Sequence, residues 1–291
     1  MSEPSSNRDL TLGVIAGGGP LPGRVAAAAR ASGRRVFIIG LDGSADPSVI
    51  AAYPHEFARI GAAGRILELL RSHRCAELVL IGPVRRPSLL DLRPDADGAR
   101  ILARLGRAAF GGDDGLLSAL IRVLSEEGFR VSGAHEILSE ALAPAGLLGR
   151  HAPDAAAMAD LARGVSVVRA MGAVDVGQGC VVQQGIVLAV EAAEGTDAML
   201  GRCAELARNG PGGVLVKMVK PGQDRRADLP TIGVETVRAA RSAGLRGIGF
   251  EAGGTLLADR AALIAEADAT GLFLLGLDPD SAAGPEPGGS L

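Results

Sequence analysis

Aromatic residues are scarce in this sequence, and tryptophan is absent altogether. Aromatics make up 2% of the 291 residues, so the chain lacks the stacking platforms on which proteins bind single-stranded nucleic acids. The formal net charge is −3, whereas a general nucleic-acid binder is strongly basic. The scarcity of aromatic residues and the lack of net positive charge both argue against nucleic acid as a partner.

Cysteines are few, and long apolar runs are missing. Cys75, Cys180 and Cys203 are widely spaced and odd in number, so neither a disulfide framework nor a zinc site is expected. No apolar run approaches the ~20 residues that span a bilayer. Residues 1–9 are polar and lack the apolar core of a secretory signal. The sequence therefore predicts a protein of the reducing cytoplasm.

The sequence does contain a regular alternation of short apolar runs and amphipathic segments. Residues 12–16, 36–39, 78–81 and 129–131 have the length of strands, and helical periodicity is found at 21–31, 63–72 and 113–128. Buried strands that alternate with amphipathic helices predict a parallel sheet covered on both faces. We therefore expect an α/β fold that begins with a Rossmann-like domain.

The length of the chain suits two domains. We expect an N-terminal Rossmann-like domain over residues 1–145 and a catalytic α/β domain over 154–279. The Pro-, Gly- and His-containing stretch 143–153 predicts the linker, and the Gly- and Pro-rich stretch 280–291 predicts a disordered tail. Strands and helices alternate less regularly in the second half, and their topology does not follow from the pattern.

A glycine-rich turn that begins with Gly17, Gly18 and Gly19 follows the first predicted strand. Glycines there let the backbone approach a ligand, and the N–H groups of a helix N-terminus attract anions. The spacing G-x-G-x-x-x-G is a near miss to the dinucleotide fingerprint, and Asp42 mimics its ribose-binding acid. A tight turn that binds nothing, an anion or nucleotide contact, and a nicotinamide site all remain open.

Three acids lie where the predicted strand 186–190 leads into a helix. Glu191, Glu194 and Asp197 stand at such a strand exit, where open α/β sheets bind their ligands. Carboxylates without His or Cys neighbours favour a hard ion such as Mg²⁺. Alternatively, Thr196 and Asp197 cap the helix and the glutamates are solvated. His135, at the end of another strand, is either a general base, a ligand-orienting group or a structural histidine.

Residues 217–233 leave a strand, pass through a charged loop with Pro and Gly, and enter a helix predicted near Thr231. Lys217 and Lys220 are the two lysines of the chain, and every other basic residue is arginine. This contrast suggests a need for a compact ammonium group, as on a phosphate. Asp224 and Asp228 add acids, so the segment fits phosphoryl chemistry. A solvated surface loop is the alternative.

Several stretches, taken in order, resemble the LpxI family of UDP-2,3-diacylglucosamine pyrophosphatases. They are LGVIAGGG at 12–19, GAHE at 133–136, VGQG at 176–179, LAVEAAEGTDAML at 188–200, KPGQDRRADLPTIG at 220–233 and the EAG within 248–260. The resemblance runs from about residue 12 to residue 279. Each stretch alone is weak, whereas the ordered set is specific.

The resemblance implies hydrolysis of UDP-2,3-diacylglucosamine to UMP and 2,3-diacylglucosamine 1-phosphate (lipid X), in lipid A biosynthesis. It implies water attack on the β-phosphorus with help from Mg²⁺, or alternatively Mn²⁺. It further implies that the substrate binds between the two domains. By analogy the protein is a homodimer, soluble or peripheral at the cytoplasmic face of the inner membrane.

The same resemblance suggests roles for individual residues. Asp228 would hold or activate the attacking water, and Asp224 is a second catalytic candidate at a position where relatives carry Glu. Asp228 would also bind the metal, together with Glu191, Glu194 and Asp197. The expected substrate-binding residues are Gly17, Gly18, Gly19, His135, Gln178, Gly179, Thr196, Lys217, Lys220, Gln223 and Thr231. The rival functions are a nicotinamide-dependent oxidoreductase and a non-catalytic nucleotide-sugar binding protein.

Overall fold

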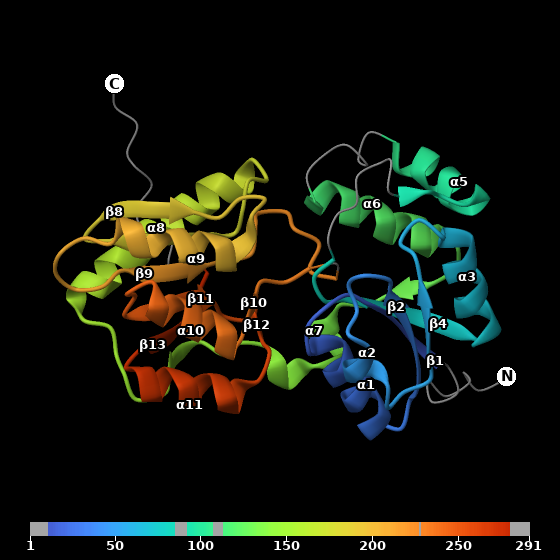
Figure 1. The fold of residues 1–291 in the computed structure, drawn as a ribbon, viewed down its shortest axis with the longest axis horizontal. Helices are drawn as coiled ribbons and strands as arrows, with labels where there is room; N and C mark the ends of the chain where they lie inside the picture. Colours follow the sequence, from blue (N-terminus) through green and yellow to red (C-terminus); the bar gives the residue numbers. More distant parts are fainter. Residues whose placement is uncertain (1–10, 85–91, 107–112, 227, 280–291) are drawn as a thin grey trace, which may run out of the picture. The chain divides into compact units, whose positions relative to one another are not determined.

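The computed structural model describes residues 11–84, 92–106, 113–226 and 228–279 (Figure 1). The chain divides into two compact units. The first unit comprises Met1–Ser139 together with Asp224–Asp228, and the second comprises Glu140–Gln223 and Leu229–Leu291. Each unit has its own sheet, so the expected α/β class is confirmed. The tail predicted at 280–291 lies outside the described residues.

The first unit contains a parallel sheet of five strands in the order β3-β2-β1-β4-β5. The central strand β1 (Thr11–Ala16) pairs with β2 (Arg35–Leu41) on one side and with β4 (Cys75–Ile81) on the other. The edge strands are β3 (His55–Ala58) and β5 (Arg130–Val131). Leu12, Val14 and Ala16 of β1 are buried and Ile15 is partly buried, because helices cover both faces of the sheet.

Those helices divide between the two faces of the sheet (Figure 1). On one face lie α1 (Leu21–Ala31), α2 (Pro47–Ile50) and α7 (Ala134–Ile137). On the other lie α3 (Ala63–Ser72), α5 (Ala96–Leu105) and α6 (Asp113–Glu126). The helices predicted at 21–31 and 63–72 have the predicted bounds, whereas β3 and α5 were not predicted.

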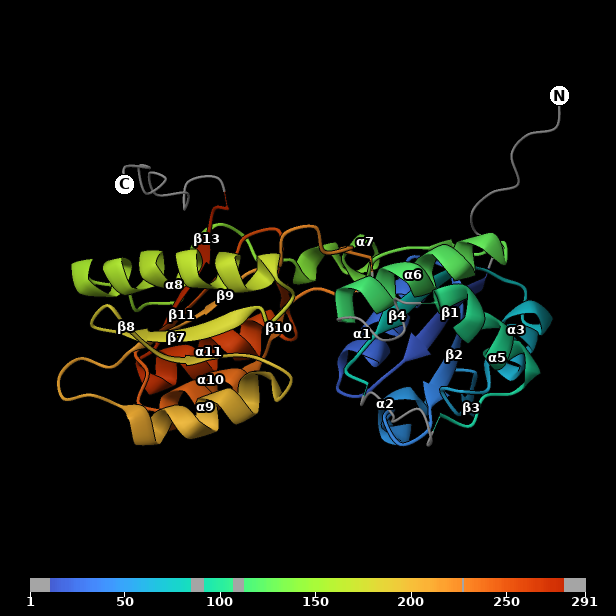
Figure 2. The same ribbon diagram turned by 90° about the horizontal axis from the view of Figure 1, so that it is seen from above.

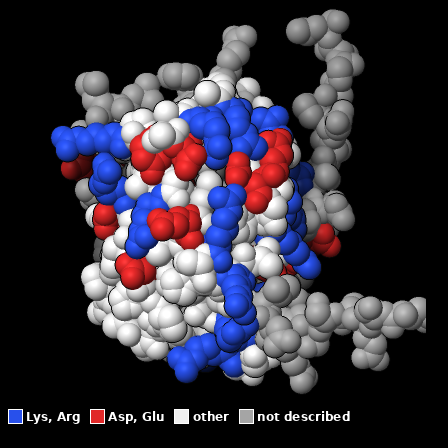
Figure 3. All heavy atoms as spheres, turned by 90° about the vertical axis from the view of Figure 1, so that its right-hand side faces the viewer, with Lys and Arg blue, Asp and Glu red and all other residues white. Residues whose placement is uncertain are grey.

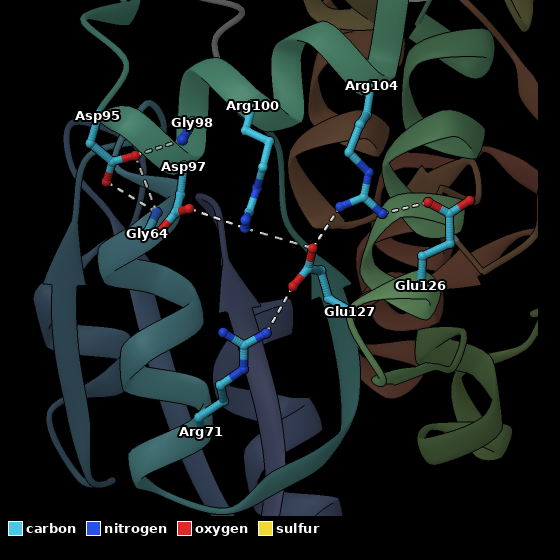
Figure 4. A network of polar contacts seen from close by, with 9 residues as sticks. All are labelled: Gly64, Arg71, Asp95, Asp97, Gly98, Arg100, Arg104, Glu126 and Glu127. Carbon is cyan, nitrogen blue, oxygen red and sulfur yellow. Dashed lines mark hydrogen bonds and ion pairs between the residues drawn. The ribbon is translucent and has the colours of Figure 1, made fainter.

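A network of arginines and acids joins α3, α5 and the end of α6 (Figure 4). Glu127 accepts hydrogen bonds from Arg71 at 2.8 Å and from Arg104 at 2.6 Å, and lies 3.9 Å from Arg100. The side chain of Glu127 is 14% exposed. On the face that carries these helices, acidic side chains lie among the basic ones (Figure 3).

We expect the substitution Glu127→Gln to destabilise the first unit by about 1–2 kcal/mol, because it removes the charge shared by several ion pairs. Hydrogen bonds from Arg104 and Arg71 lower the pKa of Glu127. The stabilisation is therefore complete above the ordinary carboxyl pKa and is lost as the pH falls through the lowered one. Hydrogen exchange of α3 and α6 in the wild-type protein and in Glu127→Gln, at neutral and at acidic pH, measures the destabilisation and its dependence on pH.

The matched control for this network is Glu68→Gln. Glu68 pairs with Arg65 one helical turn away, and both side chains are largely exposed, so its loss should change exchange rates little. Equal effects of the two substitutions would contradict a stabilising role for the network.

The second unit contains a mixed sheet in the order β6-β13-β11-β9-β7-β8. Strands β9 (Val214–Lys217), β11 (Gly247–Glu251) and β13 (Phe273–Leu277) are parallel. Strands β7 (Gly179–Gln183) and β8 (Ile186–Val190) form an antiparallel hairpin beside β9. A separate pair, β10 (Thr231–Ile232) and β12 (Leu256–Leu257), is parallel.

Helices cover both faces of this sheet as well (Figure 2). The long α8 (Ala155–Ala173) lies on one face, and α9 (Gly195–Leu206), α10 (Val234–Ser242) and α11 (Arg260–Thr270) lie on the other. Strand β6 (Gly146–Leu148) falls within the predicted linker 143–153 and pairs antiparallel with β13. This stretch thus contributes a strand to the second sheet. No described helix is long and apolar enough to cross a membrane.

A buried aspartate in α8 fixes the β7–β8 hairpin. Asp160 is 3% exposed and accepts hydrogen bonds from the backbone N–H groups of Gln184 at 3.0 Å and Gly185 at 2.7 Å. Both turn residues have positive φ, at 53° and 76°, as in the tight turns that suit a two-residue hairpin. The hairpin brings Gly179, at its start, next to Glu191, which follows its end.

Candidate functional site

Three charged side chains are buried at one end of the strands of the second sheet, which we call the sheet edge. Lys217 ends β9, Glu251 ends β11, and Glu191 follows β8. Their residues are 4%, 5% and 7% exposed, respectively. Since β7 runs antiparallel, its first residue, Gly179, pairs with Lys217 at this same edge. The edge contains the carboxyl ends of the parallel strands, where open α/β sheets bind their ligands.

A hydrogen-bonded chain links the lysine to one of the glutamates. Nζ of Lys217 donates to Oγ1 of Thr196 at 2.7 Å, and that hydroxyl donates to Oε1 of Glu191 at 2.7 Å. A buried ammonium is stable only when such partners replace its hydration. The sequence offered a helix-capping role for Thr196, and this is wrong. Helix α9 has Glu194 at its N-cap and no hydrogen bond from a capping side chain. The hydroxyl of Thr196 instead connects Lys217 with Glu191.

Glu251 holds the backbone that follows β9. Its Oε2 accepts a hydrogen bond from the N–H of Val219 at 3.1 Å. A Cβ on Gly254 would lie 2.8 Å from Val219 and would overlap the Glu251 carboxylate, so glycine is required there. Sequence analysis assigned Glu251 no role, although it stands in the EAG stretch that contributes to the family resemblance. The feature of the sequence that could have identified Glu251 is an acidic residue at the end of a buried strand.

The loop after β9 is further fixed by its own polar groups. Nζ of Lys220 lies 2.7 Å from Oδ1 of Asp175, and the N–H of Lys220 donates to Oε1 of Gln223 at 3.0 Å. The N–H of Met218 donates to the carbonyl of Gln178 at 3.0 Å. The predicted substrate-binding residues Gln178, Lys220 and Gln223 therefore take part in the hydrogen bonds that fix this loop, Gln178 through its backbone carbonyl.

The two predicted catalytic aspartates lie on the segment Asp224–Asp228, which belongs to the first unit. Asp224 accepts hydrogen bonds from the Arg226 side chain at 2.7 and 3.0 Å, and these lower the pKa of its carboxyl group. Asp228 is exposed, and its N–H lies 3.4 Å from the carbonyl of Asp224. Asp224 is thus half-buried and held by an arginine, whereas Asp228 is accessible to solvent.

Thr231 does not begin a helix. It lies in β10, and its hydroxyl donates to the carbonyl of Leu229 at 3.3 Å. Helix α10 starts at Val234, after Gly233. The prediction of a helix start at Thr231 is therefore wrong, because the short strand pairing with β12 occupies that position.

The four expected metal ligands lie in different surroundings. Glu191 is buried, Asp197 is exposed, and Glu194 is exposed and pairs with Arg202 at 2.6 Å. Asp228 belongs to the first unit. Among the described residues, no group of three or more His, Cys, Asp or Glu side chains could hold a metal ion. These residues do not by themselves form a cation centre, and metal dependence stays a prediction.

The glycine-rich turn of the first unit packs against the turn after β4. The N–H of Gly17 donates to the carbonyl of Ile81 at 2.8 Å, and that of Gly18 to the carbonyl of Pro83 at 2.9 Å. A Cβ on Gly17 would lie 2.6 Å from the carbonyl oxygen of Pro83. Two N–H groups that a dinucleotide phosphate would need are therefore already bonded. This packing favours the tight-turn interpretation over a nicotinamide site.

His135 and Gly19 complete the predicted residues of the first unit. His135 lies in α7, and its buried Nδ1 has no hydrogen-bond partner among the described residues. A Cβ on Gly133 would overlap the His135 ring and lie 3.1 Å from the carbonyl of Arg225. His135 is therefore near the segment that carries Asp228. Gly19 has a φ of 75° and, unlike Gly17, leaves space beside its Cα.

We expect Gly179→Ala to impair the site at the sheet edge. The added Cβ would lie 2.5 Å from Oε2 of Glu191, so the carboxylate would have to move and the chain to Lys217 would be disturbed. Gly201→Ala in α9 is the matched control, since nothing lies within 4 Å of its Cβ position and alanine favours a helix. Comparison of activity and melting temperature tests this: unaltered activity in Gly179→Ala would contradict it.

The fold defines a two-unit α/β protein with a cluster of buried charged side chains in its second unit, and sequence comparison identifies the family. Residues 11–141 match the LpxI N-terminal domain, and residues 144–275 match the LpxI C-terminal domain. The chain belongs to the LpxI family. It is 47% identical over 274 residues to UDP-2,3-diacylglucosamine pyrophosphatase LpxI of Caulobacter vibrioides. That alignment covers 92% of this chain and 98% of the relative.

Solved structures offer more distant likenesses. CobK precorrin-6A reductase is 13% identical, with a TM-score of 0.34, over 92% of this chain and 88% of its own. The NAD complex of Thermus thermophilus UDP-glucose 4-epimerase is 13% identical, with a TM-score of 0.32, over 94% and 92% of the two chains. At such scores these likenesses support no argument about the ligand or the reaction of this protein.

Proposed function

We propose that this protein hydrolyses the pyrophosphate bond of UDP-2,3-diacylglucosamine to UMP and lipid X, as a step of lipid A biosynthesis. The identity of 47% along nearly the whole chain to a pyrophosphatase of that name carries the proposal. The buried ammonium of Lys217 supports it, because fixed positive charge stabilises the negative charge that develops in phosphoryl transfer. The N–H groups of Gly17 and Gly18 already donate hydrogen bonds within the protein, which argues against the alternative of an NAD-dependent function.

In the proposed reaction, the oxygen of water attacks the β-phosphorus and the bond from that phosphorus to the bridging oxygen breaks. The attacking water loses a proton, which Asp228 accepts, and the bridging oxygen leaves with UMP. Lys217 stabilises charge on the phosphate, and Thr196 and Glu191 hold its ammonium in place. The exposure of Asp228 gives its carboxylate access to water and substrate.

Dependence on Mg²⁺ or Mn²⁺, a homodimeric state, and a location in the cytoplasm or at the cytoplasmic face of the inner membrane complete the proposal. They rest on membership in the LpxI family. A bound divalent cation would supply positive charge to the phosphates. The described side chains do not form a cation centre alone, so phosphate oxygens of the substrate would have to contribute to its binding.

The deciding experiment incubates the purified protein with UDP-2,3-diacylglucosamine in ¹⁸O-labelled water, with Mg²⁺, with Mn²⁺ or with a chelator. We expect equal amounts of UMP and lipid X, with the label in lipid X because water attacks the β-phosphorus. Label in UMP would contradict attack at that atom, and the absence of both products would refute the proposed function. Full turnover with the chelator would refute metal dependence alone.

A further inference from the structure

Two buried oxygens at the edge of the second sheet have no hydrogen-bond partner among the described residues. They are Oε2 of Glu191 and Oε1 of Gln178. Glu191 is 7% exposed, so this oxygen has given up water without gaining a donor. Buried polar atoms of native proteins are nearly always bonded, and an exception needs an explanation. A ligand that donates to both oxygens would supply one.

The two oxygens belong to one small region. Gln178 precedes β7 and Glu191 follows β8, and the N–H of Glu191 donates to the carbonyl of Gly179 at 2.8 Å. A Cβ on Gly179 would lie 2.5 Å from Oε2 of Glu191, so the carboxylate lies directly over this glycine. The Glu191 carboxylate therefore lies beside the residue that follows Gln178, at the start of β7.

The chemistry of these atoms restricts the ligand. A carboxylate oxygen and an amide oxygen accept hydrogen bonds, so the missing partner is a donor or a cation. A divalent cation is disfavoured, because the positive charge of Lys217, which is connected to the same carboxylate through Thr196, would repel it. The described residues also provide no group of three ligating side chains for it. A neutral hydroxyl donor satisfies both oxygens without adding charge.

We propose that Glu191 and Gln178 bind the hydroxyl groups of a sugar ring of the substrate. This inference rests on the proposed function, which supplies two such rings, the ribose of the uridylyl group and the glucosamine. Acidic side chains at strand ends of α/β sheets bind ribose hydroxyls in dinucleotide sites. Glu191 is then a substrate-binding residue rather than a metal ligand.

A short turn with exposed side chains lies next to the backbone of Glu191. A Cβ on Gly177 would overlap the carbonyl of Glu191, so this turn lies against the Glu191 backbone. Val174 and Val176 are 71% and 46% exposed, and Asp175 between them pairs with Lys220. The turn has few apolar contacts to lose, so a shift that admits a hydroxyl group has a small free-energy cost.

Equilibrium binding of four probes tests the inference on the wild-type protein, Glu191→Gln and Gln178→Leu. The probes are UMP, 2′,3′-dideoxy-UMP, glucosamine 1-phosphate and Mn²⁺ alone. If the ribose binds here, Glu191→Gln weakens UMP binding roughly 10- to 100-fold, as expected for a hydrogen bond to a charged group. Gln178→Leu weakens it about 2- to 10-fold, as expected between neutral groups, and neither substitution affects the dideoxy compound. If glucosamine binds here, its 1-phosphate shows the loss and UMP does not.

Either pattern supports the inference and identifies the ring. Unchanged affinity for both sugar phosphates, or no measurable binding of either to the wild-type protein, overturns it. Mn²⁺ binding that is lost in Glu191→Gln overturns it in favour of a cation site. Unaltered melting temperatures exclude a folding defect. Hydrolysis of UDP-2,3-diacylglucosamine by the wild-type protein is measured separately, so that failure of the proposed function is distinguished from failure of this inference.

Discussion

The substitution Asp228→Ala is expected to lower turnover of UDP-2,3-diacylglucosamine by about 10²- to 10⁴-fold, the range that a positioned acid–base group contributes. Asp228 is exposed, so its side chain contributes little to the core and the variant should fold normally. Substrate binding should be largely retained, because Lys217 and Lys220, which we propose to contact the phosphates, are unchanged. Single-turnover kinetics, with the equilibrium affinity for the substrate, separate the chemical step from binding.

The control for Asp228 is Asp224→Asn on the same segment. The carboxylate of Asp224 already accepts three hydrogen bonds from Arg226, which leaves it less available to water. Its loss should release Arg226 and change activity far less than the loss of Asp228. A fully active Asp228→Ala protein would contradict the assignment, and a larger effect at Asp224 would transfer the catalytic role to that residue.

The first sheet was predictable because its pattern is local and regular. Apolar runs such as residues 12–16 alternate with helices whose ends are marked by glycine, as at Gly33. The second sheet was not predictable as a topology. Its strand β6 lies in a stretch with Gly and Pro that reads as a linker, and its pairing with β13 joins residues more than 120 positions apart. Local propensity contains no information about such a pairing.

The site was predictable in its residue types but not in their contacts. The contrast between two lysines and many arginines singled out Lys217, which is buried at the sheet edge, and its contact with phosphate stays a prediction. Nothing in the spacing showed that Thr196 would connect it to Glu191, since the three residues come from different elements. The assignment of Asp224–Asp228 to the first unit is also a long-range property.

We expect Lys217→Met to lower turnover by about 10²- to 10³-fold, as is typical when a fixed group that stabilises transition-state charge is removed. Methionine has a similar length and packs in the same buried position, so the loss of the ammonium is the main change. Turnover is measured as kcat and KM on the purified variant. Arg238→Met, which removes an exposed cation from α10, is the matched control and should leave both constants unchanged.

A purely structural role of Lys217 makes a different prediction. If the ammonium serves only to compensate the buried charge of Glu191, Lys217→Met leaves that charge uncompensated and destabilises the second unit. The double variant Lys217→Met with Glu191→Gln would then regain both stability and kcat at saturating substrate, because the two substitutions remove the pair together, while the lost contact of Glu191 with the sugar raises only KM. We expect stability to recover in the double variant but turnover to remain low. Recovery of turnover would show that the lysine acts through Glu191 and not on the substrate.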